Sequence, residues 1–212
     1  MKTVKKILEA TLFMSALFLT PPAGAFEYKT GASNALQVGA AVYIQGMMHE
    51  LGHNVIAYQL EATSSKMEFF TNKNGNFFLG LNTASGIKED SWVSYRMGGF
   101  VFSNITFEIA LSSYRKNPTL FSKTLAIMSA TDFFRYSAFA FGLGHDDVEE
   151  YDPAYVSKKS GFSKEALLLG SLTQALVNVY RLYSENDAVI PFIEFSGDHI
   201  NNSVLFGFRI KL

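Results

Sequence analysis

The fold is decided by the stretch from Asn34 to Tyr58, which reads NALQVGAAVYIQGMMHELGHNVIAY. This stretch lacks proline and is apolar for most of its length, so it predicts one long helix. Near its end lie His49-Glu50-Leu51-Gly52-His53, which form an HExxH pattern. Imidazole and carboxylate groups are costly to bury in an apolar helix unless they bind something or pair with one another. The motif therefore marks a candidate functional site.

The spacing of the motif fits metal chemistry. Residues four apart on a helix share one face, so His49 and His53 can reach a single ion. Glu50 lies between them and can act as a general base toward a water molecule. The chain has no cysteine, so any metal must be held by histidine and carboxylate groups. Such a ligand set suits zinc best among the common ions.

A third metal ligand must come from elsewhere in the chain. The metzincin extension is excluded, because it requires glycine at position 56 and histidine at position 59, where this chain has Ile56 and Gln59. Two aspartates are the main candidates, Asp132 and Asp146, with Glu108 and His199 as further possibilities. Asp132 is surrounded by apolar residues, where a carboxylate needs a partner; Arg135, three residues on, is the alternative to a metal. Asp146 belongs to a polar segment and could equally be solvated.

The rest of the chain predicts a mainly α fold, a bundle of about four long apolar helices with two β-hairpins. One hairpin is expected at residues 66–81, directly after the HExxH helix, because aromatic runs flank an Asn/Gly-rich turn. A second is expected at the C-terminus, over residues 188–212, where apolar residues alternate. The three further helices are expected at residues 91–115, 120–143 and 163–184, with a polar stretch at 145–160. The helices at 34–58 and 163–184 are long enough to span a bilayer.

The first 25 residues have the pattern of a secretory signal peptide. A cationic head precedes an apolar run from Ile7 to Thr20, and Ala23-Gly24-Ala25 forms a cleavage pattern of small residues. We expect one domain over residues 26–212, located in the bacterial cell envelope, in the inner membrane or the periplasm. An uncleaved membrane anchor is the alternative interpretation of this segment.

The amino-acid composition indicates which kinds of partner the chain can bind. The net charge is −1, and Lys and Arg are scattered, so no basic surface for nucleic acid is expected. Hydrophobic residues make up 48% and charged residues 17% of the chain, a balance that favours contact with a membrane. The mean hydropathy of +0.11 is modest for a protein made of spanning helices. A soluble periplasmic bundle therefore stays open.

An HExxH motif in an apolar helix, followed by a hairpin and further apolar helices, resembles the site-two protease type of membrane-embedded zinc metallopeptidase. The resemblance implies that His49 and His53 hold zinc, that Glu50 is the base and that Asp132 completes the site. It also implies that the Gly98-Gly99 pair and Asn104 correspond to a glycine-containing segment with a nearby asparagine in that family. Only the HExxH part of the match is specific, and residues 145–212 have no counterpart.

The sequence thus predicts a zinc-dependent metallohydrolase that acts on a peptide or protein substrate in or at the envelope membrane. The alternative is a non-enzymatic envelope protein with a structural metal site, or with a polar network that holds no metal. Glu50 argues against a structural site, because such a site has no use for a carboxylate between its two histidines, and it normally has four protein ligands.

Overall fold

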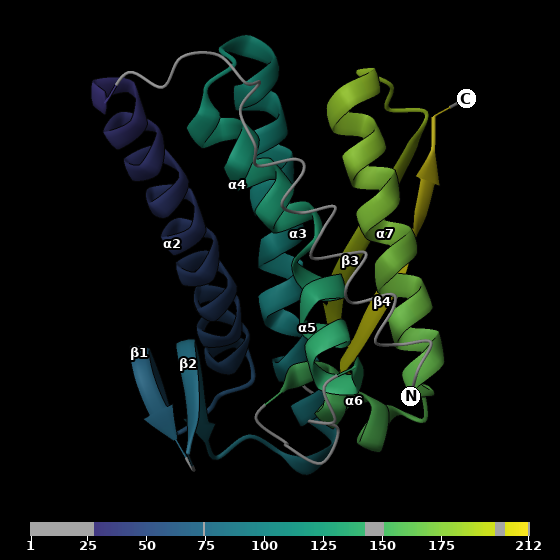
Figure 1. Cartoon of the computed structure of the whole chain (residues 1–212). Coiled ribbons are helices and arrows are strands. Elements are labelled where there is room, and N and C mark those ends of the chain that lie inside the picture. The colour runs from purple at the N-terminus through teal and green to yellow at the C-terminus, as the bar shows by residue number, and fades with distance from the viewer. Residues whose placement is uncertain (1–27, 74, 143–150, 198–201, 212) are drawn as a thin grey trace.

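The computed structural model describes residues 28–73, 75–142, 151–197 and 202–211 (Figure 1). The helices among these residues are α2 (Tyr28–Gln59), α3 (Trp92–Lys116), α4 (Leu120–Ala130), α5 (Asp132–Gly142), α6 (Asp152–Ser160) and α7 (Lys164–Ser184). The strands are β1 (Ser64–Lys73), β2 (Asn76–Ser85), β3 (Val189–Gly197) and β4 (Asn202–Ile210). A short 3-10 turn, Glu89–Ser91, leads into α3.

The long helices form a bundle with α3 at its centre (Figure 1). Helix α2 packs along α3 and α4, and α7 lies on the other side of the bundle, against α5. The β1–β2 hairpin sits at the C-terminal end of α2, which is the end that carries the HExxH motif. The β3–β4 hairpin packs against α3 and α7. Both hairpins are antiparallel, as the sequence predicts.

The mainly helical class with two hairpins is confirmed, but the prediction of four helices is wrong, since the described residues form six. The expected helix at 120–143 is broken into α4 and α5 at Thr131, whose backbone leaves the helical region (φ −100°, ψ 0°). The Thr131 hydroxyl donates a hydrogen bond to the Ile127 carbonyl at 2.8 Å. Such a side-chain bond competes with the backbone ladder and bends helices. The break makes Asp132 the first residue of α5.

Helix α6 lies within residues 145–160, which the sequence predicts to be a polar stretch without a helix. It begins at Asp152, with Pro153 in its first turn, where the missing N–H of proline costs nothing. It ends before Gly161, which adopts the left-handed conformation (φ 79°) that favours glycine. Both boundary signals are present in the sequence. They give α6 its limits but not its place in the bundle.

The expectation that the stretches at 34–58 and 163–184 could cross a bilayer is not met. Among the described residues, no helix combines the length and the apolar character that a membrane span requires. In α2 the reason is visible in the sequence, because Gln37, Gln45 and the polar groups of the motif dilute its hydropathy.

Glycines set the distance between α2 and α3. A Cβ atom on Gly52 would lie 2.3 Å from the Gly98 carbonyl oxygen and 2.8 Å from the Cβ of Phe102. A Cβ on Gly98 would in turn lie 2.8 Å from the Gly52 carbonyl oxygen. The two backbones therefore touch, and no larger residue fits at either position. Gly46, six residues earlier on α2, has open space around it.

We predict opposite effects for alanine at these two glycines of α2. Gly52→Ala should lower the free energy of unfolding by about 1–3 kcal/mol, because it overpacks the contact with α3. Gly46→Ala should raise that free energy by up to about 1 kcal/mol, because alanine favours a helix interior. Thermal unfolding of both variants measures the difference. Equal melting temperatures for the two variants would contradict the close contact.

A buried arginine joins α7 to α3. Arg181 is 2% exposed and donates two hydrogen bonds to the Glu108 carboxylate, at 2.6 and 2.9 Å. It donates a third to Asp187, at 2.9 Å, in the turn that leads to β3. Arg115, near the end of α3, also donates to Asp187. The two guanidinium groups hold the pKa of Asp187 at about 2, below its ordinary value.

This shift predicts a pH-dependent contribution to stability. Because the folded-state pKa of Asp187 is depressed, its contribution is complete above the unfolded-state pKa of about 3.9 and is lost as the pH falls through about 2. Asp187→Asn should therefore be less stable than the parent protein at pH 7. The gap between the two should close as the pH is lowered from 4 toward 2. Urea unfolding at several pH values measures this difference in the free energy of unfolding. A difference that does not change with pH would contradict the ion pair.

Candidate metal centre

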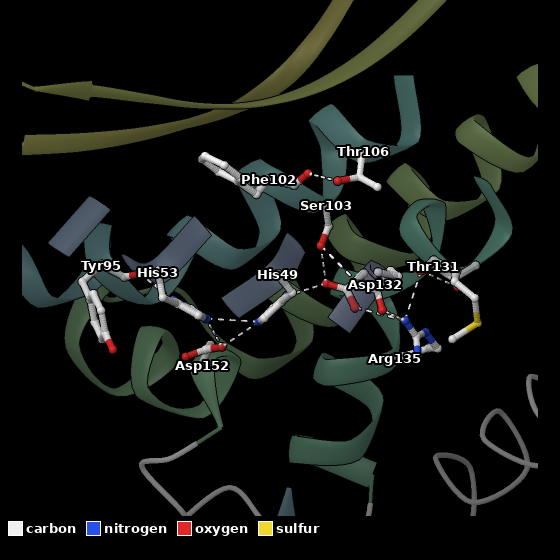
Figure 2. Close-up of polar contacts among 12 residues, drawn as sticks. His49, His53, Tyr95, Phe102, Ser103, Thr106, Thr131, Asp132, Arg135 and Asp152 are labelled. Atoms are coloured by element: carbon white, nitrogen blue, oxygen red, sulfur yellow. Dashed lines mark hydrogen bonds and ion pairs between the residues drawn. The ribbon is translucent and has the colours of Figure 1, made fainter. Parts of the chain in front are cut away.

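Three donor atoms from α2 and α6 converge at the centre of the site (Figure 2). The Nε2 atoms of His49 and His53 lie 3.1 Å apart. The Oδ2 atom of Asp152 lies 3.4 Å from the first and 3.2 Å from the second. All three side chains are buried. The helical spacing of the motif brings the two imidazoles together, and α6 brings the carboxylate to them.

On each histidine ring, the hydrogen bond at Nδ1 determines which ring nitrogen carries the hydrogen. The Nδ1 atom of His53 lies 2.9 Å from the Tyr95 carbonyl oxygen, which can only accept, so this nitrogen must carry a hydrogen. The Nδ1 atom of His49 lies 2.7 Å from Asp132, which also accepts a hydrogen bond from the Ser103 hydroxyl. A neutral imidazole has one N–H, so in the neutral form of each ring it is Nε2 that presents a lone pair.

Three electron-rich atoms thus face one another in a buried space, an arrangement that requires a cation between them. A tetrahedral zinc ion with bonds of about 2.0–2.2 Å has ligand atoms about 3.3–3.5 Å apart. The separations of 3.1, 3.2 and 3.4 Å lie within that range or about 0.2 Å below it, so the three atoms can form one face of that tetrahedron. The donor set, two imidazoles and a carboxylate, also fits zinc in its chemistry. A proton on His49 is the other cation that satisfies the geometry.

Asp132 lies behind His49 rather than beside the three donors. Its Oδ2 atom contacts Nδ1, the ring nitrogen on the side opposite the converging Nε2. Arg135 donates to its other oxygen at 3.0 Å, so the pair with Arg135, which the sequence offered as the alternative to a metal, is present. Burial acts to raise the pKa of Asp132, but His49, Arg135 and Ser103 together lower it. An ionised Asp132 holds the ring of His49 in one orientation.

Charged groups next to the three donor atoms compensate the charge of the site. Arg96 donates to the second oxygen of Asp152 at 3.2 Å. Burial acts to raise the pKa of Asp152, but the two imidazoles and Arg96 hold it well below its ordinary value. Burial acts to lower the pKa of His49, whereas Asp132 and Asp152 raise it well above its ordinary value. The site therefore attracts positive charge, whether a metal ion or a proton.

Aromatic rings and a glycine shape the space around His49. The ring of Tyr136 stacks on the imidazole with centroids 4.6 Å apart, and Phe100 meets it edge-on at 5.2 Å. A Cβ on Gly99 would lie 2.4 Å from Nε2 of His49. Glycine at this position of α3 is thus what leaves room for the imidazole, and the Gly98-Gly99 pair serves the contact between α2 and α3.

Glu50 faces a cavity of about 230 Å³ that also reaches His53 and Asp152. Its side chain rests on Gly80 of β2, where a Cβ would lie 2.7 Å from its Cγ. Among the described residues, no side chain donates a hydrogen bond to this carboxylate. Burial raises the pKa of Glu50, His49 and His53 act to lower it, and the negative charges of Asp152 and Asp132 act to raise it; the pKa lies above its ordinary value. A raised pKa makes this carboxylate a better proton acceptor than an exposed glutamate.

The structure brings together only part of the predicted ligand set. His49, Glu50 and His53 lie together as the motif predicts. Asp132 contacts Nδ1 of His49 and not the Nε2 atom that faces the other donors. Glu108 pairs with Arg181. Asp146 and His199 lie outside the described residues. The prediction missed Asp152, whose only sequence signal is the Asp-Pro pair that begins α6.

Comparisons with protein-family models, curated proteins and solved structures give no significant match. The resemblance to site-two proteases therefore stays a prediction that rests on the motif.

We predict that the purified protein binds about one zinc ion and that His49→Ala and Asp152→Asn abolish binding. Asp132→Asn should weaken zinc binding by about 10–100-fold without abolishing it, because it removes only the group that orients His49. Asp90→Asn, at an exposed aspartate in the 3-10 turn that precedes α3, is the control. Elemental analysis and competition with a chelator measure the affinities. Zinc retained by Asp152→Asn but lost from Asp132→Asn would identify Asp132 as the ligand instead.

Proposed function

We propose that this chain is a zinc-dependent hydrolase that cleaves peptide bonds, with Glu50 as its general base. The observation that carries the proposal is the position of Glu50, a buried carboxylate without a hydrogen-bond donor among the described residues. It faces a cavity whose wall also includes His53 and Asp152. A purely structural metal site has no need of such a group, or of a cavity beside it.

The residues divide the chemistry between them. His49, His53 and Asp152 would hold zinc, which when bound supplies a Lewis acid and lowers the pKa of water. Glu50 accepts a proton from the attacking water at its carboxylate oxygen and delivers it to the departing amine. Asp132 keeps the Nδ1 hydrogen of His49 in place and so keeps Nε2 available as a ligand.

Strand β2 supports a peptide as the substrate. Residues Phe78 to Asn82 of this strand line the cavity next to Glu50. In the described residues the sheet has two strands, so β2 pairs with β1 on one side only. An extended peptide could add to the other edge by main-chain hydrogen bonds, which are independent of the peptide's sequence.

The location follows from the sequence. We propose that the protein acts in or at the bacterial envelope membrane, to which the signal-like segment at residues 1–25 would direct it. Large apolar side chains are exposed on several elements, among them Tyr58, Leu36 and Ile210. Such side chains are compatible with contact with a membrane or with other proteins.

A second candidate function is a non-enzymatic envelope protein with a polar network that holds no metal. The raised pKa of His49 favours it, because a protonated imidazole between Asp132 and Asp152 also satisfies the three converging atoms. The two candidates differ in a measurable way. Zinc binding at neutral pH favours the hydrolase, and its absence favours the protonated network.

We predict that Glu50→Gln abolishes peptide hydrolysis, with a loss of about 10²–10⁴-fold, while the protein keeps its zinc. The loss is expected because glutamine cannot accept the proton, although it fills the same space against Gly80. A mixture of fluorogenic peptides measures hydrolysis, and elemental analysis measures the metal. Glu68→Gln is the matched control, because Glu68 is on β1 and pairs with Lys66 at the surface.

Two results would contradict the proposal. Hydrolysis that survives Glu50→Gln would show that Glu50 is not the base. A protein that binds zinc but hydrolyses no peptide in the mixture would favour a structural role for the metal.

A further inference from the structure

One face of helix α5 forms part of the wall of the cavity at the candidate metal centre. Four residues, spaced by three and four positions, project from this face: Asp132, Arg135, Tyr136 and Phe139. The first contacts His49, and the other three line the cavity. The helix face that orients a proposed zinc ligand therefore also presents a cation and two aromatic rings to a molecule bound in the cavity.

The hydrogen bonds of Arg135 account for only one nitrogen of its guanidinium group. Nη2 donates to Asp132 at 3.0 Å, to the Met128 carbonyl oxygen at 3.0 Å and to Gln45 at 3.2 Å. Nε is buried and has no hydrogen-bond partner among the described residues. A guanidinium group has five N–H donors, so the one on Nε and the two on Nη1 are left for a ligand. A buried donor without a partner is uncommon in a folded protein and requires an explanation.

A carboxylate is the ligand that best fits these donors. The Arg135 side chain is 26% exposed and lies in the cavity wall. A planar guanidinium group matches a carboxylate in both geometry and charge. Asp132 divides its two oxygens between His49 and Arg135, so it compensates the charge of the arginine only in part. Figure 2 shows Arg135 and Asp152 on opposite sides of His49, so the negative charge of Asp152 lies away from this position.

Arg135 lies close to the candidate metal centre. One oxygen of Asp132 accepts its hydrogen bond, and the other lies 2.7 Å from Nδ1 of His49. One carboxylate and one imidazole ring therefore separate the guanidinium group from the Nε2 atom proposed to bind zinc. An extended chain advances about 3.3–3.6 Å per residue, so a carboxylate on Arg135 lies within a residue or two of a carbonyl at the metal centre. The cavity of about 230 Å³ is smaller than typical ligand pockets of about 300–1,000 Å³, and it suits a short piece of a substrate.

We propose that Arg135 is a specificity-determining residue that binds a carboxylate of the peptide substrate, within a residue or two of the cleaved bond. This inference rests on the proposed hydrolase function and names its substrate class, peptides with a negative charge close to the cleaved bond. The free C-terminal carboxylate and an acidic side chain both supply this group. Phe139, four residues along α5 and 42% exposed, offers an apolar surface to a neighbouring side chain of the substrate.

The binding of three short peptides to the full chain, supplied with zinc, tests the proposal. The peptides are acetyl-glycyl-phenylalanine with a free carboxylate, its amide, and the amide of acetyl-glycyl-aspartate, which has its carboxylate on the side chain. Isothermal titration calorimetry measures the dissociation constants. The parent protein should bind at least one of the two acids about 10–100-fold more tightly than the uncharged amide, as expected for a charged hydrogen bond. The preferred acid identifies the source of the carboxylate.

Arg135→Lys tests whether this arginine is the group that binds the acid. Lysine can keep the pair with Asp132, but its single nitrogen cannot also replace Nε and Nη1. The variant should therefore keep its circular dichroism and zinc content and lose the preference for the acid. Arg115→Lys is the matched control, which should keep the preference. Arg115 also pairs with an aspartate, Asp187, and is 27% exposed, but it does not line the cavity.

Two results would overturn the proposal. One is a parent protein that binds neither acid more tightly than the amide, a result that requires no variant to fold. The other is a preference that persists unchanged in Arg135→Lys, which would place the carboxylate on the zinc ion. Because binding is measured separately from hydrolysis, the two proposals can fail independently. A protein that prefers the acid but hydrolyses no peptide would contradict only the hydrolase, and one that hydrolyses peptides without this preference would contradict only the role of Arg135.

Discussion

The close approach of α2 and α3 is the constraint on which the site depends. The backbones of the two helices touch at Gly52 and Gly98, and Gly99 leaves room for the imidazole of His49. This contact also places the Tyr95 carbonyl oxygen against His53, which fixes the proton on that ring. A wider spacing between the helices would separate both histidines from the groups that orient them. Glycine inside a helix costs stability, so its presence at these positions is explained by the contact it permits.

The three carboxylates around the two histidines differ in their position and in their charged partners. Asp152 is positioned to share a cation with the imidazoles, and Asp132 is positioned to orient one of them. Each aspartate is in turn paired with an arginine, Arg96 for the first and Arg135 for the second. The histidines, together with these arginines, keep the pKa of both carboxyl groups low although they are buried. Glu50 has no such partner among the described residues, and its pKa rises where theirs fall. The difference in surroundings separates the proposed proton acceptor from the proposed metal ligands.

The sequence alone predicted the helix with the motif, the two hairpins and the boundaries of α7, because each depends on local signals. It did not predict the break at Thr131, where a single side-chain hydrogen bond competes with the helix. It also left Asp152 unassigned. The contact between His49 and Asp152 joins residues 103 positions apart, and it depends on how α6 packs against α3. No periodicity or spacing in a single sequence contains that information. The apolar surroundings of Asp132 in the sequence indicate correctly that its carboxylate needs a partner, but they do not indicate which atom it meets.

Helix α7 shows why a pattern of apolar residues does not by itself reveal which side of a helix is buried. It has two apolar faces, and the more regular one points outward. The orientation is decided by Arg181, whose guanidinium group must reach both Glu108 and Asp187. Turning α7 to bury Leu169 and Leu176 would expose Leu167 and Leu182. It would also break the three charged hydrogen bonds of Arg181, each of which is worth about 1.5–3 kcal/mol. Burying a leucine that is now exposed would return about 1.5–3 kcal/mol.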